Sequence, residues 1–329
     1  PLLREVLGAT LGVDPSSVGV GDHGLVLARI LGSIRPEVDL YLLDDCRPED
    51  VVSDPAASGL RRVFYEVEEP LEIHLAILEG VDERYRTPYF DNLKRYAQKP
   101  IATFHALPIA RGKSVFRSEW IRDMGEFYGP TLFLAESSAT TGGLDSLLEP
   151  TGNIKLAQDA AARAFGADKV FFVTNGTSTS NKMVYQALCQ PGDIVIVDRN
   201  CHKSHHYGCV LAGAQPYYVE AFPLTAYSMY GSVPLRTIKK ALLDLKAAGR
   251  LDKVRMIALT NVTFDGHMYD TRRVMEECLA IKPDLVFMWD EAWFGFGRFN
   301  WMYRRRTAMG ARREIAEWFA DPRSLEAYL

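Results

Sequence analysis

The 329-residue sequence lacks the features that mark several classes of protein. No apolar run approaches the roughly 20 residues of a membrane-spanning helix, and there is no internal repeat or low-complexity tract. The 38 basic and 42 acidic side chains nearly balance, so nothing indicates binding to nucleic acid or an anionic membrane. The five cysteines are scattered without CxxC spacing. We therefore expect reduced thiols in a cytoplasmic protein, and neither a disulfide framework nor a metal site.

The composition is that of a globular chain with a substantial core. Hydrophobic residues make up 47% of the sequence and charged residues 24%, which excludes general disorder. At this length we expect about two domains of roughly 150 residues each. The first part predicts a helix over 25–31, a strand over 38–43, a loop or linker over 50–59, and a charged, helix-prone zone over 63–99.

The second half of the sequence alternates short apolar runs with helical stretches. We predict strands over 170–174, 194–197, 256–260 and 285–289, with helices over 154–165 and up to Leu188. This alternation predicts an α/β fold whose mainly parallel sheet has helices on both faces. Ligands of such sheets bind beyond the carboxyl ends of the strands. Polar segments stand at those positions: 175–178, 198–202, 261–265 and 290–291.

Two glycine motifs match nucleotide-binding patterns only in form. Residues 19–24 read GxGxxG, but the preceding segment contains Pro15 and too few apolar side chains for the buried strand that this motif requires. We interpret it as a glycine-rich loop before a helix. Gly112-Lys113-Ser114 resembles the end of a phosphate-binding loop, but Leu107 stands where the first glycine belongs, so we reject that interpretation.

Three other groups stand at predicted strand ends. Gly176, Thr177 and Ser178 place hydroxyls and free N–H groups at a helix start, which favours phosphate binding, although a simple N-cap is as plausible from this motif alone. Asp290 follows an apolar strand and is suited to pairing with a ring nitrogen, holding a metal, or capping a helix. His202 follows another strand end.

The neighbouring His205 and His206 match no common zinc spacing, and we expect both to be solvated loop residues. Taken together, a phosphate cradle, a flat imidazole and a buried carboxylate predict a pocket for pyridoxal phosphate. In that cofactor the carboxylate would keep the pyridine nitrogen protonated, so that the ring can accept electrons.

From about Tyr89 to Met309 the sequence resembles the Orn/Lys/Arg decarboxylase family of fold-type-I pyridoxal-phosphate enzymes. Four motifs in order carry the resemblance: FFVTNGTSTSNK (171–182), DRNCHKS (198–204), TFDG (263–266) and DEAWF (290–294). It implies an aspartate-aminotransferase-like core over 106–329, incomplete at its C-terminus. It also implies linker helices over 58–105 and part of a flavodoxin-like wing domain over 1–57.

The resemblance also implies roles for individual residues. Thr177 and Ser178, with Gly176 beside them, would bind the cofactor phosphate, and His202 would stack on the ring. Asp290 would pair with the pyridine nitrogen. Ala292 would pack against the opposite face of the ring, and Trp293 would help to wall the pocket. The alternative for Trp293 and Phe294 is core packing. Asp265 would lie near the site.

The implied reaction is decarboxylation of arginine, lysine or ornithine to the amine and CO2, a lyase step of amino acid metabolism and polyamine biosynthesis. Members of the family complete their sites across dimer interfaces, so a homo-oligomer built from dimers is implied. They also hold the cofactor as a Schiff base on a lysine in a Ser-x-His-Lys motif. No lysine follows Lys282 and no initiator Met is present, so we expect a piece of a longer chain. The alternatives are another pyridoxal-phosphate enzyme, such as an aminotransferase or lyase, and a non-catalytic paralogue or assembly subunit.

Overall fold

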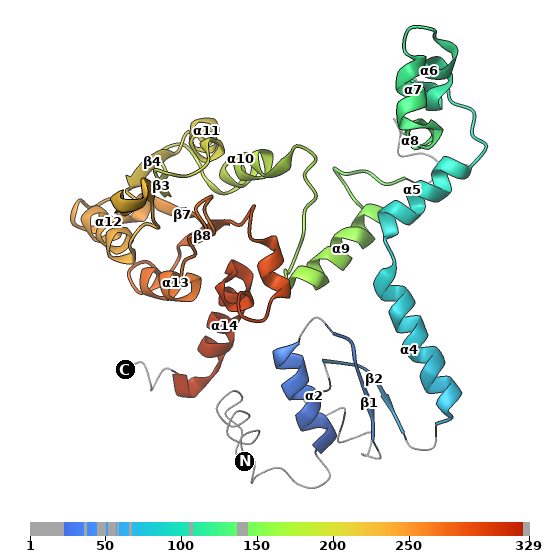
Figure 1. The fold of residues 1–329 in the computed structure, drawn as a ribbon. Coiled ribbons are helices and arrows are strands. Elements are labelled where there is room, and N and C mark those ends of the chain that lie inside the picture. Colours follow the sequence, from blue (N-terminus) through green and yellow to red (C-terminus); the bar gives the residue numbers. More distant parts are fainter. Residues whose placement is uncertain are drawn as a thin grey trace. The chain divides into compact units, whose positions relative to one another are not determined.

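The computed structural model describes residues 23–35, 38–44, 51, 57, 59–65, 68–104, 108–136 and 144–324. Figure 1 shows the order of the elements along the chain. The chain divides into two compact units, each described here by itself. The first comprises residues 1–164 with 168–170, and the second comprises 165–167 with 171–329. Among the helices of the described residues, none is both long enough and apolar enough to cross a lipid bilayer.

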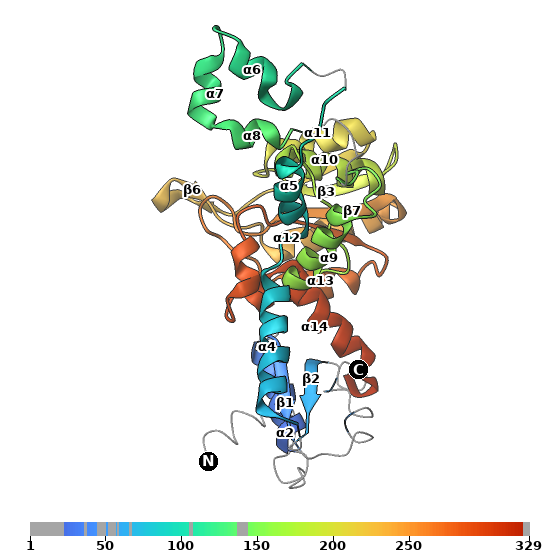
Figure 2. The ribbon, with the colours of Figure 1, turned by 90° about the vertical axis from the view of Figure 1, so that its right-hand side faces the viewer.

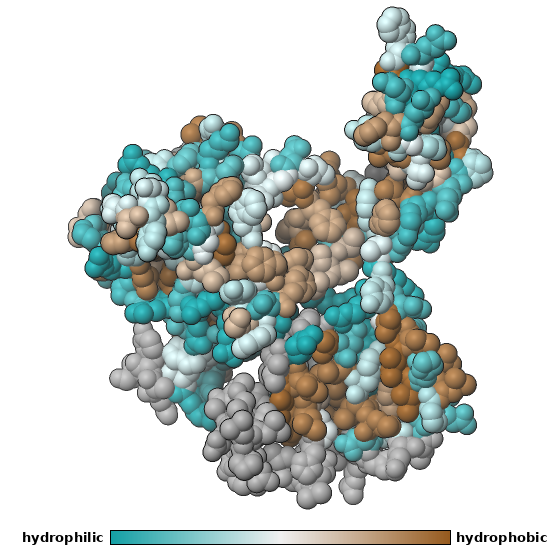
Figure 3. Space-filling model, in the orientation of Figure 1, coloured by the Kyte–Doolittle hydropathy of each residue, from teal (hydrophilic) through white to brown (hydrophobic). Residues whose placement is uncertain are grey.

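The first unit begins with a small α/β layer followed by helices (Figures 1 and 2). Its elements are α2 (His23–Ile34), β1 (Leu40–Leu43), β2 (Leu60–Phe64), α4 (Pro70–Tyr85), α5 (Pro88–Gln98), α6 (Lys113–Arg117), α7 (Arg122–Tyr128), α8 (Pro130–Leu134) and α9 (Asn153–Phe165). The strands β1 and β2 pair in parallel, and α2 packs on β1 with Leu25 and Ile30 buried. Apolar side chains remain exposed along α4, where Figure 3 shows them gathered. The predicted helices at 25–31 and 154–165 are confirmed.

A buried arginine organises the short helices of this unit. The 3-10 turn η3 (Ala110–Gly112) brings the Arg111 guanidinium under the C-terminal carbonyls of α5 and α8. Gly112, at φ 91°, leads into α6, and a Cβ there would stand 2.8 Å from that of Phe133. This glycine therefore serves close packing. The GxGxxG match at 19–24 lies almost wholly outside the described residues.

The second unit is built on a four-stranded parallel sheet in the order β4-β3-β7-β8. The strands are β3 (Ile194–Asp198), β4 (Gln215–Val219), β7 (Val254–Thr260) and β8 (Val286–Asp290), and a small antiparallel pair, β5 (Pro223–Leu224) and β6 (Met229–Tyr230), stands apart. Because both faces of the sheet are covered, β3 is buried at every position. The predicted parallel sheet is confirmed, with three of its strands at the expected positions.

Helices cover the two faces of this sheet (Figure 1). They are α10 (Gly176–Leu188), α11 (Lys203–Ala212), α12 (Leu235–Ala247), α13 (Thr271–Leu279) and α14 (Ala308–Ala320), with 3-10 turns η4 (Thr225–Tyr227), η5 (Leu251–Lys253), η6 (Gly295–Phe299) and η7 (Arg304–Arg306). Val195 and Val197 belong to the core cluster on the α10 and α11 face, and Ile194 and Ile196 to the one on the α12 and α13 face. This alternation of side chains is what a strand imposes.

The strand predicted over 170–174 is wrong. The structure has an extended segment and a turn there, and within the described residues no strand pairs with it. Phe171 is 75% exposed. An apolar run forms a strand only where another backbone satisfies its N–H and C=O groups, and no neighbouring strand does so at this position.

Candidate functional site

Asp290 lies at the carboxyl end of β8, buried to 6% exposure. Its Oδ2 accepts hydrogen bonds from Asn181 Nδ2 at 2.9 Å and His205 Nε2 at 3.0 Å, and its Oδ1 accepts one from the Ala292 N–H at 3.1 Å. Burial alone would raise the pKa of this carboxyl, but the bonds from His205, Asn181 and Ala292 outweigh it and hold the pKa below its ordinary value. Asp290 therefore carries a negative charge in the interior.

The expectation that His205 and His206 are solvated loop residues is wrong. Both stand on α11, and His205 is 0% exposed, between Asp290 and the Tyr185 hydroxyl, which lies 3.2 Å from its Nδ1. Because the Asp290 carboxylate can only accept, His205 Nε2 carries the proton of that bond. His206 is half-buried and packs on Tyr218, with ring centroids 5.5 Å apart.

Two further carboxyls at strand ends differ from Asp290 in their charge behaviour. Burial raises the pKa of Asp198, at the end of β3. Burial also raises the pKa of Glu291, and the neighbouring negative Asp290 adds to that rise, although Asn261 Nδ2 (2.7 Å) and the Ala308 N–H (2.8 Å) donate to its Oε1. Of the three groups, Asp290 is thus the one held most firmly ionised.

The N-terminus of α10 faces the same region. Asn181, whose amide bonds Asp290, comes four residues after Thr177 and three after Ser178, so all three stand on one face of the helix. Gly176 begins the helix at φ 69°, and a Cβ there would meet nothing within 4 Å. The helix start is therefore open, and Thr177 and Ser178 stand about one turn before Asn181, whose amide bonds the buried carboxylate.

His202 is the N-cap of α11. Its Nδ1 accepts from the Ser204 N–H at 3.2 Å and lies 2.9 Å from Ser204 Oγ, while the ring stays exposed. Ser204 Oγ in turn accepts from Asn181 Nδ2 at 2.9 Å. One hydrogen-bonded chain thus joins His202 to the amide that bonds Asp290, so the structure brings these predicted residues together.

Ala292 and Trp293 come two and three residues after Asp290, and both are exposed. Trp293 is 61% exposed and packs against Phe264, with ring centroids 5.0 Å apart. Phe294, in contrast, is buried in the core. Core packing is therefore wrong for Trp293 and right for Phe294. Phe264 comes from the loop after β7, so that loop and the turn after β8 meet beside the site.

Sequence reasoning missed five residues that build the site: Asn181, Ser204, His205, Asn261 and Glu291. A signal existed for the α11 face. Ser204 is followed by small residues at intervals of four, Gly208 and Ala212, which is the spacing of a buried helix face, and His205 stands beside it. Asn261 and Glu291 fall in the polar segments expected at strand ends, but nothing in the local sequence indicates their partners, which are distant along the chain.

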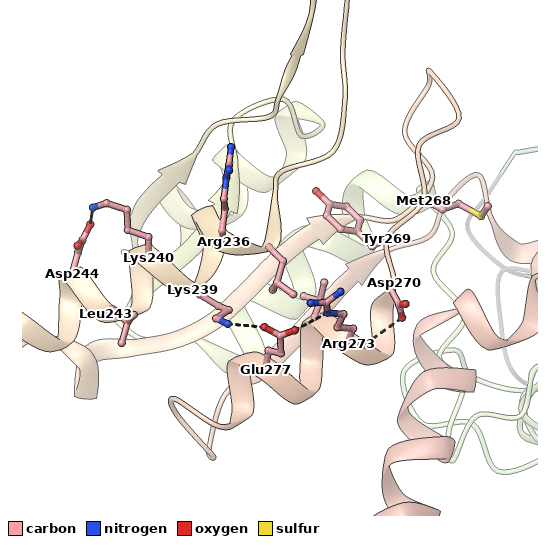
Figure 4. A pocket seen from close by; sticks show the side chains of 12 residues that line it. Arg236, Lys239, Lys240, Leu243, Asp244, Met268, Tyr269, Asp270, Arg273 and Glu277 are labelled. Atoms are coloured by element: carbon pink, nitrogen blue, oxygen red, sulfur yellow. Dashed lines mark hydrogen bonds and ion pairs between the residues drawn. The ribbon is translucent and has the colours of Figure 1, made fainter. Parts of the chain in front are cut away.

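A separate hollow of about 660 Å³ lies between α12 and α13, on the other face of the sheet (Figure 4). Leu235 and Val274 are among the residues that line it, and Figure 4 shows its acidic side chains paired, as in the Lys239–Glu277–Arg273 cluster. None of the predicted site residues lines this hollow. The candidate site is therefore at the strand ends.

The chain matches a known protein family over most of its length. Residues 87–320 match the family model described as "Orn/Lys/Arg decarboxylase, major domain". The fold is that of an α/β protein of the fold-type-I class, and the chain belongs to the Orn/Lys/Arg decarboxylase family.

The relatives match most of this chain, whereas the chain spans less than half of each relative's length. A lysine decarboxylase of Pseudomonas aeruginosa is 33% identical over 316 residues, 90% of this chain and 41% of the relative. The inducible ornithine decarboxylase of Escherichia coli is 33% identical over 258 residues, 74% of this chain and 34% of the relative. The solved structure of lysine decarboxylase A from Pseudomonas aeruginosa superposes with a TM-score of 0.63 at 28% identity, covering 87% of this chain and 40% of that one.

Proposed function

We propose that this chain supplies most of the cofactor-binding core of a pyridoxal-phosphate-dependent decarboxylase. The substrate would be a basic amino acid (arginine, lysine or ornithine) and the products its amine and CO2. Membership of the Orn/Lys/Arg decarboxylase family supports the reaction class. Relatives named for lysine, ornithine and arginine all match, so the choice among the three stays open.

The observation that carries the proposal is the hydrogen-bond balance of Asp290. A carboxylate offers about four acceptor positions. Donors among the described residues fill both acceptor positions of Asp290 Oδ2 and one of the two on Oδ1. One acceptor position on Oδ1 is therefore left. A buried anion with one acceptor position left suits a protonated ring nitrogen, since a charge-assisted hydrogen bond would fill that position. The residues present therefore fit pyridoxal phosphate.

The opposite end of the cofactor would lie at the α10 N-terminus. Thr177 and Ser178 would donate their hydroxyls to the phosphate, and the free N–H groups of the first turn would add to them. Gly176 supports this assignment, because its φ of 69°, which glycine adopts without strain, lets the chain turn into the helix at this point.

The remaining assignments concern the faces of the ring. His202, exposed and fixed by Ser204, would stack on one face; Ala292 would pack on the other, and Trp293 would wall the pocket. When bound, pyridoxal phosphate supplies an electron-withdrawing ring that stabilises the negative charge left at the α-carbon as CO2 departs. The part played by Asp290 is to keep the ring nitrogen protonated, and that of His205 and Asn181 is to keep Asp290 ionised.

The proposal extends to the assembly and location of the protein. As a member of this family it would act in the cytoplasm as a homo-oligomer built from dimers. Residues 1–57 would be part of a wing domain, 58–105 linker helices, and 106–329 the cofactor-binding core.

Release of CO2 from each of the three amino acids tests the proposal, using the natural protein at its native length. We expect one of them to be decarboxylated in the presence of pyridoxal phosphate, and Asp290→Asn to lower kcat by at least roughly 100-fold. The matched control is Asp284→Asn, whose exposed carboxylate pairs with Lys282, and it should retain activity. Absence of CO2 from all three substrates would refute the proposed reaction.

A further inference from the structure

A strained residue stands directly after β7. Val262 has φ 65°, in the left-handed region that β-branched residues almost never adopt. Such backbone strain persists only where the surrounding structure imposes it, and it concentrates at functional sites. Two questions follow: which residue imposes the strain, and what the strained conformation holds in place.

The neighbouring Asn261 is firmly fixed in the interior. Asn261 is 0% exposed, and three of the four hydrogen bonds that its side chain can make are formed. Its Nδ2 donates to Glu291 Oε1 at 2.7 Å and to the Arg306 carbonyl at 2.9 Å, and its Oδ1 accepts from the Tyr269 N–H at 3.2 Å. Its own N–H donates to the Asp290 carbonyl at 2.9 Å. Asn261 thus ties the end of β7 to the end of β8 and to the turn before α14.

The Asn261–Tyr269 bond closes the loop 261–269 at its base. Inside the loop, Thr263 N–H donates to the His267 carbonyl at 3.2 Å, and Gly266 N–H donates to the Thr263 carbonyl at 2.9 Å. The loop projects Phe264, 87% exposed, against Trp293. Trp293 follows Asp290 by three residues, so the loop lies against the segment that carries the candidate carboxylate.

We propose that Asn261 is a positioning residue: it holds Val262 in its strained conformation and thereby keeps Phe264 against Trp293 as the aromatic wall beside Asp290. The wall rests on the proposed function, whereas the clamp concerns this chain alone. Loss of the Asn261 side chain would let Val262 relax to negative φ, and the loop would move away from Trp293.

Hydrogen exchange of the natural protein at its native length, without added cofactor, tests the clamp. The reporters are the amides of Thr263 and Gly266, whose bonds do not involve the Asn261 side chain. We expect Asn261→Ala to speed their exchange at least tenfold. Adding Val262→Gly should restore slow exchange, since glycine adopts positive φ without strain, whereas adding Val262→Ala should restore much less.

The rescue separates a strain clamp from ordinary loss of a buried polar group. If Asn261→Ala and Asn261→Ala/Val262→Gly exchange equally fast, or if Asn261→Ala changes nothing, the proposal is overturned. Val262→Gly alone adds a measurement that does not depend on folding of the Asn261 variant. It should raise the midpoint of thermal unfolding, and a lowered midpoint, the usual effect of glycine in a loop, would contradict strain at this position.

Pyridoxal phosphate binding to the same variants tests the wall. We expect Asn261→Ala to weaken binding of the cofactor at least fivefold and Asn261→Ala/Val262→Gly to recover most of it. If the parent protein binds no pyridoxal phosphate, the proposed function fails while the exchange results still decide the clamp. If exchange responds as expected and binding does not, Asn261 holds the loop but the loop is no wall of the site.

Discussion

Replacing His205 by leucine gives a demanding test of the buried network. The variant removes a hydrogen bond to an ionised carboxylate, which contributes about 1.5–3 kcal/mol, and deprives the Tyr185 hydroxyl of its imidazole partner, which costs about 1–3 kcal/mol. The side chains of His205 and Tyr185 are both fully buried, so water cannot replace the lost imidazole as a hydrogen-bond partner. We expect the free energy of unfolding at pH 7 to fall by about 3–5 kcal/mol.

The pH dependence of this loss follows from the lowered pKa of Asp290. A carboxyl whose folded pKa is depressed stabilises the fold above its unfolded pKa, about 3.9, and loses that contribution as the pH falls through the folded value. Without the His205 donor the folded pKa of Asp290 rises. The difference between His205→Leu and the parent should therefore shrink as the pH falls from the raised folded pKa of Asp290 in the variant to the lowered one in the parent.

Chemical denaturation followed by circular dichroism at several pH values measures both effects. His206→Leu is the matched control, because His206 is the next residue on the same helix and its ring lies against Tyr218 on the half-exposed side. A loss below about 1 kcal/mol for His205→Leu, or an equal loss for His206→Leu, would refute the role given to His205.

Three other substitutions have expected outcomes that denaturation can check. Gly208→Ala would place a Cβ 2.6 Å from the Tyr185 ring and should cost about 1–3 kcal/mol, whereas Gly59→Ala, with open space around it, should change little. Glu291→Gln keeps an acceptor for Asn261 but cannot ionise. Because burial raises the folded pKa of Glu291, the variant should gain stability relative to the parent as the pH rises from about 4 to 7. A loss of stability relative to the parent over that range would contradict this expectation. Arg111→Ala removes donors to four backbone carbonyls, two of them at 2.7 and 2.9 Å. The free energy of unfolding should fall by about 3 kcal/mol, and an unchanged denaturation midpoint would refute this expectation.

The sheet was predictable because its strands are apolar runs buried on both faces, as at 194–197 and 256–260. The same reasoning fails at 170–174, since a strand also needs a paired backbone, which composition does not report. Among the site residues, Asp290 was accessible to sequence reasoning because it ends such a run.

The hydrogen-bond partners of Asp290 could not be predicted from the sequence. Asn181 and His205 lie 109 and 85 residues from it along the chain, and only the packing of α10 and α11 on the sheet brings them to its carboxylate. The strain at Val262 is equally invisible in the sequence, because valine there gives no sign of a positive φ.

The central claim is that the ionised Asp290 holds the ring nitrogen of pyridoxal phosphate. Equilibrium titration of the natural protein with pyridoxal phosphate tests it most directly, comparing Asp290→Asn with the control Asp284→Asn. Losing a charge-assisted hydrogen bond of about 1.5–3 kcal/mol predicts a dissociation constant raised roughly 10- to 150-fold for Asp290→Asn and unchanged for Asp284→Asn. Equal affinity of Asp290→Asn and the parent would contradict the claim.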